Sequence, residues 1–198
     1  MIRKSIMSAC VSAGLLGASL GSASAVCEQV TFSDVGWTDI TATTAVSSVI
    51  LDALGYETET KLLSVPVTYA SLAKGDIDVF LGNWMPTMEA DIAPYRDAGT
   101  VVTVRENLEG AKYTLAVNDK AAMAGIRNFA DIAKFRDELD GKIYGIEPGN
   151  DGNCLIIDMI TSNAFGLNGF EVVESSEQGM LAQVKRAQSR GEMIVFLG

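Results

Sequence analysis

The sequence predicts an α/β fold with two lobes, in which helices flank sheets that are rich in parallel strands. Short β-like runs alternate with amphipathic helical stretches, a pattern that is typical of parallel sheets covered by helices. The same order of elements occurs in both halves of the chain, and an extended stretch joins the halves. Two similar units favour two lobes over the alternative, which is one continuous sheet.

The first unit alternates predicted strands with predicted helices. Gly55 and Gly75 end its first two helices, and Pro94 is expected to break the third. The short apolar run at residues 77–81 is typical of a buried parallel strand. Its predicted strands cover residues 30–35, 58–65, 77–81 and 101–104, and its predicted helices cover residues 40–54, 67–74 and 87–98.

The second unit repeats this order. Its predicted strands cover residues 112–117, 143–146, 171–174 and 193–197, and its predicted helices cover residues 128–139, 154–165 and 178–190. Each unit also contains the run Val-Phe-Leu-Gly, at residues 79–82 and 195–198. We therefore expect lobe 1 in residues 26–110 and lobe 2 in residues 111–198, with a crossing segment at residues 106–118 between them.

The second unit stops where the first unit continues into Asn-Trp-Met-Pro. Gly198 is predicted to lie at the tip of a strand, which is where α/β folds build their ligand sites. A domain rarely ends on an uncapped apolar strand. We therefore expect that the C-terminal end of lobe 2 is truncated and that the second half of lobe 1 is missing.

The N-terminus has the composition of a secretory signal peptide. Arg3 and Lys4 precede an uncharged stretch of apolar and small residues at 6–20, and residues 23–25 form an A-x-A cleavage site. The apolar stretch is shorter than the roughly 20 residues that a membrane-spanning helix needs. We expect residues 1–25 to be removed on export and the protein to be periplasmic.

The composition excludes several classes of function. The net charge of −10 argues against a nucleic-acid partner and would attract cationic solutes. The chain has no histidine, so Ser-His-Asp and Cys-His catalysis are absent and zinc is disfavoured. We expect no enzymatic activity, no cofactor and no metal. Export permits a disulfide between Cys27 and Cys154, but the sequence leaves their pairing open.

Aromatic residues occupy the loops that follow predicted strands. Trp37 and Trp84 are the two tryptophans of the chain, and each lies in a glycine-containing loop after a predicted strand. Tyr113 lies in the crossing segment. The carboxyl ends of parallel strands line the ligand crevice of open α/β sheets, so these rings are candidate walls of a binding site. Core packing is the alternative for all three residues. Several aromatic faces suit a cation without hydrogen-bond donors, such as a trimethylammonium group.

Two polar residues are candidates for the rest of such a site. Asp39 follows Trp37 closely and could supply a countercharge or accept a hydrogen bond from a hydroxyl group. Equally, it could cap the helix that begins near Ile40. Asn150 lies in the Gly-rich turn at residues 147–153, which precedes a helix and could hold a polar group. An ordinary capped turn is the alternative.

These residues belong to motifs that resemble a known family. The chain from Val26 onward resembles the substrate-binding proteins of ABC importers for choline, glycine betaine and proline betaine, and it is most similar to the periplasmic choline-binding type. The motifs are Gly36-Trp37-Thr38-Asp39, Lys74-Gly75-Asp76-Ile77-Asp78, Gly82-Asn83-Trp84-Met85-Pro86, Lys112-Tyr113 and Gly145-Ile146-Glu147-Pro148-Gly149-Asn150.

The resemblance implies a type II-like periplasmic binding protein that closes on its ligand and passes it to an ABC permease in the inner membrane, with a monomer as the expected state. Trp37, Trp84 and Tyr113 would form an aromatic box around the ammonium group, and Asp39 and Asn150 would hold the hydroxyl end of choline. A further tryptophan would follow Gly198 in longer relatives. Alternatives are a protein for glycine betaine or proline betaine, a sensor or interaction module with this fold, and a truncated product that binds nothing.

Overall fold

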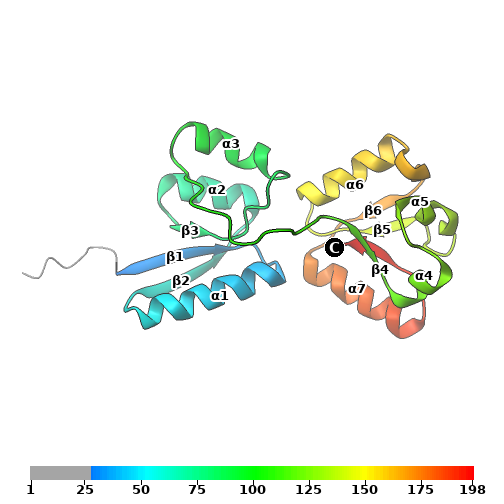
Figure 1. Cartoon of the computed structure of the whole chain (residues 1–198), viewed down its shortest axis with the longest axis horizontal. Helices are drawn as coiled ribbons and strands as arrows, with labels where there is room; N and C mark the ends of the chain where they lie inside the picture. Colours follow the sequence, from blue (N-terminus) through cyan, green and yellow to red (C-terminus); the bar gives the residue numbers. More distant parts are fainter. Residues whose placement is uncertain (1–27) are drawn as a thin grey trace, which may run out of the picture.

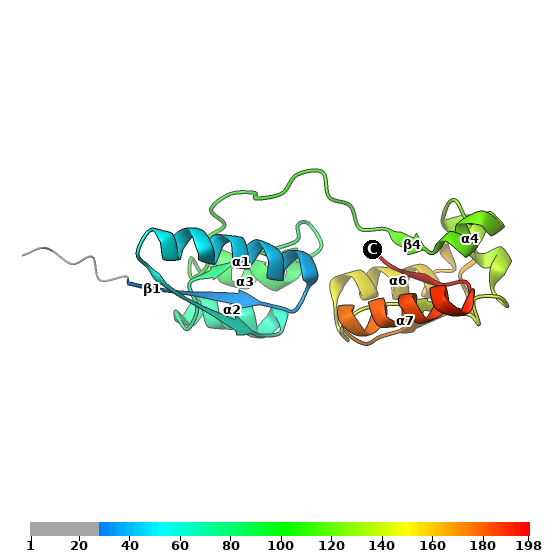
Figure 2. The ribbon, with the colours of Figure 1, turned by 90° about the horizontal axis from the view of Figure 1, so that it is seen from below.

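The computed structural model describes residues 28–198, in two groups of elements that lie side by side along the long axis (Figure 1). The predicted signal peptide and Cys27 lie outside the described residues. Within residues 28–198, no helix has the length and apolar character needed to cross a membrane. Each group contains its own sheet, and the crossing segment runs between the groups (Figure 2). We call the group from β1 to α3 lobe 1 and the group from β4 to β7 lobe 2.

Lobe 1 is built on a sheet of parallel strands in the order β2-β1-β3. Ser33 of the central strand pairs with Phe80, so β1 and β3 end at the same edge of the sheet. The elements are β1 (Gln29–Asp34), α1 (Thr38–Ala53), β2 (Glu57–Leu62), α2 (Val65–Lys74), β3 (Val79–Phe80) and α3 (Glu89–Asp97).

Lobe 2 is built on a sheet in the order β4-β7-β5-β6. The strands β5, β6 and β7 are parallel, and β4 pairs antiparallel with β7 because the crossing segment enters the lobe in the opposite direction. The elements are β4 (Leu115–Val117), α4 (Asp119–Ala124), α5 (Phe129–Ile132), η1 (Ala133–Phe135), β5 (Lys142–Tyr144), α6 (Asp151–Thr161), η2 (Ala164–Gly166), β6 (Glu171–Val173), α7 (Glu177–Arg190) and β7 (Val195–Leu197).

The predicted α/β class with two lobes and parallel-rich sheets is confirmed. One set of buried apolar side chains extends through both lobes and includes Trp37 and Ile40 from lobe 1 and Ile146 and Met180 from lobe 2. These side chains connect the two lobes, and both sheets direct the carboxyl ends of their parallel strands toward the space between the lobes.

Several predicted elements are wrong in detail. Residues 101–104 form no strand, because no neighbouring strand pairs with their backbone. The side chains of Val102 and Val104 are exposed. Pro94 lies inside α3 and does not break it. The long helix predicted at residues 128–139 is instead the short α5 followed by a 3₁₀ turn.

The sequence interpretation also missed helix α4. The side chain of Asn118 caps it by accepting a hydrogen bond from the backbone N–H of Ala121 at 3.2 Å. This helix is short and Ala-rich and lacks a long apolar stripe, so its sequence pattern is weak.

Candidate ligand-binding site

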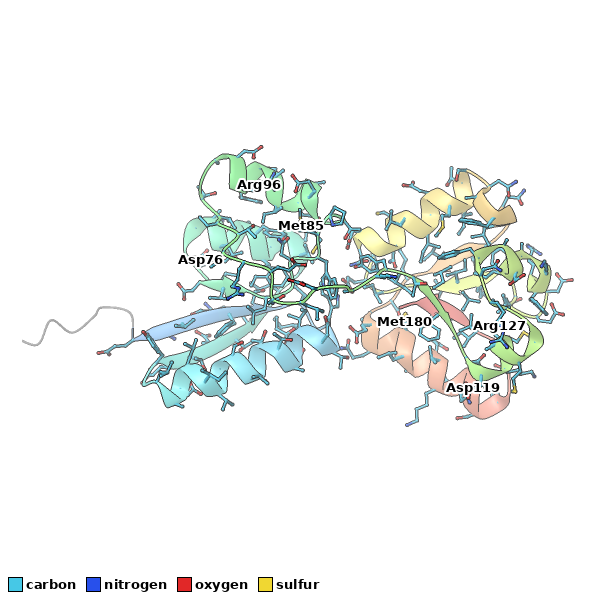
Figure 3. All side chains as sticks on the ribbon, in the orientation of Figure 1. Asp76, Met85, Arg96, Asp119, Arg127 and Met180 are labelled. Atoms are coloured by element: carbon cyan, nitrogen blue, oxygen red, sulfur yellow. The ribbon has the colours of Figure 1, made fainter. Side chains whose placement is uncertain are left out.

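A cavity of about 310 Å³ lies between the lobes. Its walls come from the loops after β1 and β3, the crossing segment, the ends of β5 and β7, and the first turns of α1 and α7. Aromatic and aliphatic side chains dominate these walls. The lining residues are Trp37, Asp39, Trp84, Ala111, Lys112, Tyr113, Ile146, Glu177, Met180, Leu181, Phe196, Leu197 and Gly198. In Figure 3, Met85, next to Trp84 in sequence, lies on lobe 1 where it faces lobe 2, and Met180 lies on lobe 2.

The topology of lobe 1 brings Trp37 and Trp84 together. Because β1 and β3 are parallel neighbours, the loops that follow them leave the same edge of the sheet. Gly36 makes the turn before Trp37 with a φ of +86°, a conformation that glycine adopts without strain. Its N–H donates to Asp34 Oδ1 at 2.7 Å, which fixes the turn. Near Trp84, a Cβ on Gly82 would lie 2.9 Å from Ile40 Cγ1, so a side chain there would displace the loop.

The loop that carries Trp84 is held at several points. The hydroxyl of Tyr69 donates to Asn83 Oδ1 at 2.6 Å, and the backbone N–H of Trp84 contacts Met88 Sδ at 3.1 Å. The hydroxyl of Thr87 donates to the carbonyl of Trp84 at 3.1 Å. These bonds place the indole of Trp84 with its centroid 6.3 Å from that of the Tyr113 ring, at an interplanar angle of 41°.

Trp37 is buried and is bound to the opposite lobe. Its Nε1 donates to Glu147 Oε1 at 2.9 Å, and Glu147 follows β5 of lobe 2. The bond satisfies the polar atom of a side chain that is 4% exposed. The indole is therefore fixed in orientation while the ring remains part of the cavity wall.

Asp39 lies in the first turn of α1 and lines the cavity. The interpretation of Asp39 as the helix cap is wrong, because the N-cap position is Trp37 and the helix begins at Thr38. Partial loss of hydration raises the pKa of the Asp39 carboxyl, and the negative charge of Glu177 raises this pKa further.

Tyr113 contributes a half-exposed ring from the crossing segment. Its hydroxyl donates to Asp151 Oδ1 at 3.4 Å. Desolvation raises the pKa of the Tyr113 phenol above its usual range, and the carboxylate of Asp151 adds to this effect. The phenol is therefore neutral at physiological pH and presents its ring and its hydroxyl without charge.

Asn150 is buried and does not line the cavity. It caps α6, since its Oδ1 accepts from the N–H of Gly152 at 2.8 Å. Its Nδ2 donates to Glu147 Oε1 at 3.3 Å, the same oxygen that accepts from Trp37. The structure thus brings Trp37, Asp39, Trp84 and Tyr113 around one cavity. Asn150 lies outside the cavity wall and is linked to Trp37 through Glu147.

Two residues at this site were missed as parts of it. Glu147 accepts hydrogen bonds from both Trp37 and Asn150. In the sequence it is an acidic residue in a turn, which does not predict this role. Glu177 lines the cavity and accepts hydrogen bonds from the backbone and hydroxyl of Thr38. An acid in the first turn of a helix is so common that its sequence position carries no signal for such a role.

A family model described as the substrate-binding domain of ABC-type glycine betaine transport systems matches residues 28–198. The chain belongs to this family. Among curated proteins, an uncharacterized protein (ORF1) of Chromohalobacter salexigens is 51% identical over 129 residues, which cover 65% of this chain and 83% of that protein.

Solved structures of substrate-binding proteins are similar to this chain. An ABC-transporter choline-binding protein in complex with choline is 73% identical, with a TM-score of 0.79 over 87% of this chain and 60% of that one. A glycine betaine and L-proline-binding protein from Borrelia burgdorferi is 29% identical, with a TM-score of 0.70 over 86% of this chain and 62% of that one. The chain therefore spans about three fifths of the length of these proteins.

Proposed function

We propose that the protein captures choline outside the cytoplasm for uptake by an ABC permease of the inner membrane, acting as a monomer and without catalysis. The observation that carries this proposal is the shared cavity of Trp37, Trp84 and Tyr113 with Asp39 at its wall. Aromatic faces attract a quaternary ammonium group by about 0.5–2 kcal/mol each, and such a group needs no hydrogen-bond acceptor.

The acid distinguishes choline from other quaternary ammonium compounds in this proposal. The carboxylate of Asp39 can accept a hydrogen bond from the hydroxyl of choline and balance the charge of the ammonium group. It would repel the carboxylate of glycine betaine. Asn150 acts indirectly, because it holds Glu147 and thereby Trp37, rather than through contact with the ligand.

Glycine betaine is the second candidate, and one residue favours it. Lys112 lines the same cavity and could pair with a carboxylate. The side chain is exposed and lies in the crossing segment, so water screens its charge more strongly than that of a buried group.

Calorimetric titration of the purified protein with choline, and in parallel with glycine betaine, tests the proposal. We expect saturable binding of choline that is tighter than that of glycine betaine. The variant Trp84→Ala removes one aromatic wall of the cavity and is the control for the aromatic site. A far-UV spectrum checks that each protein is folded. Tighter binding of glycine betaine would favour the second candidate, and a folded protein that binds neither compound would overturn both.

A further inference from the structure

Helix α1 lacks a side-chain cap of its own. Its N-cap residue is Trp37, whose side chain makes no capping hydrogen bond. The first N–H groups of a helix have no partner within the helix, so this end needs acceptors from elsewhere. The acceptors come from the other lobe: Glu177 accepts from the N–H of Thr38 with Oε1 at 3.2 Å and Oε2 at 3.1 Å. The hydroxyl of Thr38 also donates to Oε1.

Glu177 is itself in the first turn of a helix. It begins α7, whose N-cap Ser176 accepts from the N–H of Gly179 at 3.1 Å. The carboxylate of Glu177 therefore lies between the N-terminal ends of α1 and α7, where two helix dipoles favour negative charge. The next residue strengthens the contact, because Gln178 Nε2 donates to the carbonyl of Gly36.

The same carboxylate is part of the cavity wall. Glu177 lines the cavity together with Asp39, and these two acids are opposed there by one cation, Lys112, among the lining residues. Asp39 lies one residue beyond Thr38, so the hydrogen bonds that hold Glu177 also keep its carboxylate near that of Asp39. The raised pKa of Asp39 reflects this proximity, after the larger effect of desolvation.

We propose that Glu177 is a specificity-determining residue that disfavours quaternary ammonium ligands bearing a carboxylate. The hydrogen bonds from Thr38 hold its carboxylate at the cavity wall, where an incoming anion meets a negative charge. A ligand whose polar end is a hydroxyl meets no such repulsion and donates to Asp39. This inference rests on the proposed function, since it concerns which quaternary ammonium compound the same cavity accepts.

The test compares Glu177→Gln with Gln178→Ala, using choline and glycine betaine as ligands in calorimetry. Glutamine keeps an acceptor for Thr38 and removes the charge, whereas Gln178→Ala removes a neighbouring contact between the lobes and leaves the charge. We expect Glu177→Gln to raise the affinity for glycine betaine relative to choline by roughly three- to tenfold, the size of one screened charge interaction at short range. Gln178→Ala should leave this ratio within about twofold of the wild type, since Gln178 carries no charge.

A second measurement separates selectivity from loss of the cap. In Glu177→Ala, the amide of Thr38 should exchange its hydrogen faster in the unliganded protein, while Glu177→Gln should keep most of the protection. If Glu177→Gln still binds choline and its ratio of glycine betaine affinity to choline affinity is unchanged, the selectivity role of Glu177 is overturned and the proposed function stands. If the wild type binds neither compound, the proposed function fails and the selectivity role fails with it.

Discussion

The indole Nε1 of Trp37 lies 2.9 Å from Oε1 of Glu147, and the two residues belong to different lobes. Trp37 follows β1 and lines the cavity, whereas Glu147 follows β5 and also accepts from Asn150. One carboxylate oxygen therefore joins the loop of lobe 1 to the turn of lobe 2. Any separation of the lobes must break this hydrogen bond, and the indole N–H then needs another acceptor, such as water.

Replacement of Glu147 should weaken choline binding through Trp37. Glu147→Ala leaves the indole N–H without its acceptor, which costs about 1–3 kcal/mol where the group stays buried. Glu147→Gln keeps an acceptor and should lose less affinity. Calorimetry with choline measures both. The matched control is Glu138→Ala, an exposed acid of lobe 2, and equal losses in Glu138→Ala and Glu147→Ala would contradict the prediction.

The ring of Tyr113 should contribute to choline affinity more than its hydroxyl does. Tyr113→Ala removes an aromatic face and is expected to weaken binding by about 0.5–2 kcal/mol, whereas Tyr113→Phe keeps the face and should cost less. Tyr56→Ala is a fitting control, because Tyr56 has nearly the same exposure, 39% against 37% for Tyr113, and does not line the cavity. A larger loss in Tyr113→Phe than in Tyr113→Ala would rule out the ring as the binding element.

Choline binding should weaken as the solution becomes acidic. The pKa of Asp39 is raised, so its carboxylate takes up a proton at a higher pH than an ordinary aspartate, whose pKa is about 3.9. Once protonated, Asp39 no longer balances the ammonium charge. Affinity is therefore present above the raised pKa and is lost as the pH falls through it. Titrations of the wild type and Asp39→Asn across the acidic range measure this, and Asp39→Asn should show a weaker affinity with little of this pH dependence.

The raised pKa of Asp39 affects folding stability in the opposite direction to choline affinity. A carboxyl whose pKa is higher in the folded than in the unfolded state disfavours folding when ionised, and this penalty is relieved as the pH falls through the folded-state pKa. Asp39→Asn should therefore unfold at the same or a higher temperature than the wild type at neutral pH. Thermal unfolding followed by circular dichroism tests this. A clear loss of thermal stability in the variant would show that Asp39 supports the fold as well as the site.

Asn153 should be essential for the stability of lobe 2. It is fully buried, its Oδ1 accepts from the N–H of Ile146 at 3.0 Å, and its Nδ2 donates to Glu174 Oε1 at 3.0 Å and to two backbone carbonyls. Asn153→Ala leaves several of these partners unsatisfied and should lower the free energy of unfolding by about 2–4 kcal/mol. Denaturant unfolding measures it. The exposed Asn168→Ala is the control, and it should change stability by less than about 0.5 kcal/mol.

Much of the fold was predictable because local patterns and packing agree. The period-two alternation of β2 and the glycine ends of α1 and α2 mark elements that the tertiary structure keeps. Residues 101–104 have the same strand-like composition, but strand formation also needs a neighbouring strand, and a local sequence pattern does not reveal one. Helix α4 depends on a side-chain cap more than on an apolar stripe.

The cavity was predictable in part for a similar reason. Trp37, Trp84 and Asp39 follow strands whose order in the sheet can be inferred, so their meeting follows from topology. The roles of Glu147 and Glu177 depend on how two lobes face one another, over separations of 110 and 139 residues along the chain. No local sequence pattern predicts such a contact. In the sequence, Glu147 resembles an ordinary turn residue and Glu177 an ordinary residue at the start of a helix.

The two tryptophans of the chain both lie in the cavity wall. Within residues 28–198, light absorbed selectively by indole therefore reports on this cavity. The indole of Trp37 donates a hydrogen bond to a carboxylate of the opposite lobe, so its emission should respond to separation of the lobes. Both indoles line the cavity, so both should respond to a ligand that enters it. The molecule carries an internal optical probe, and both ligand entry and domain motion can be followed in it without a dye.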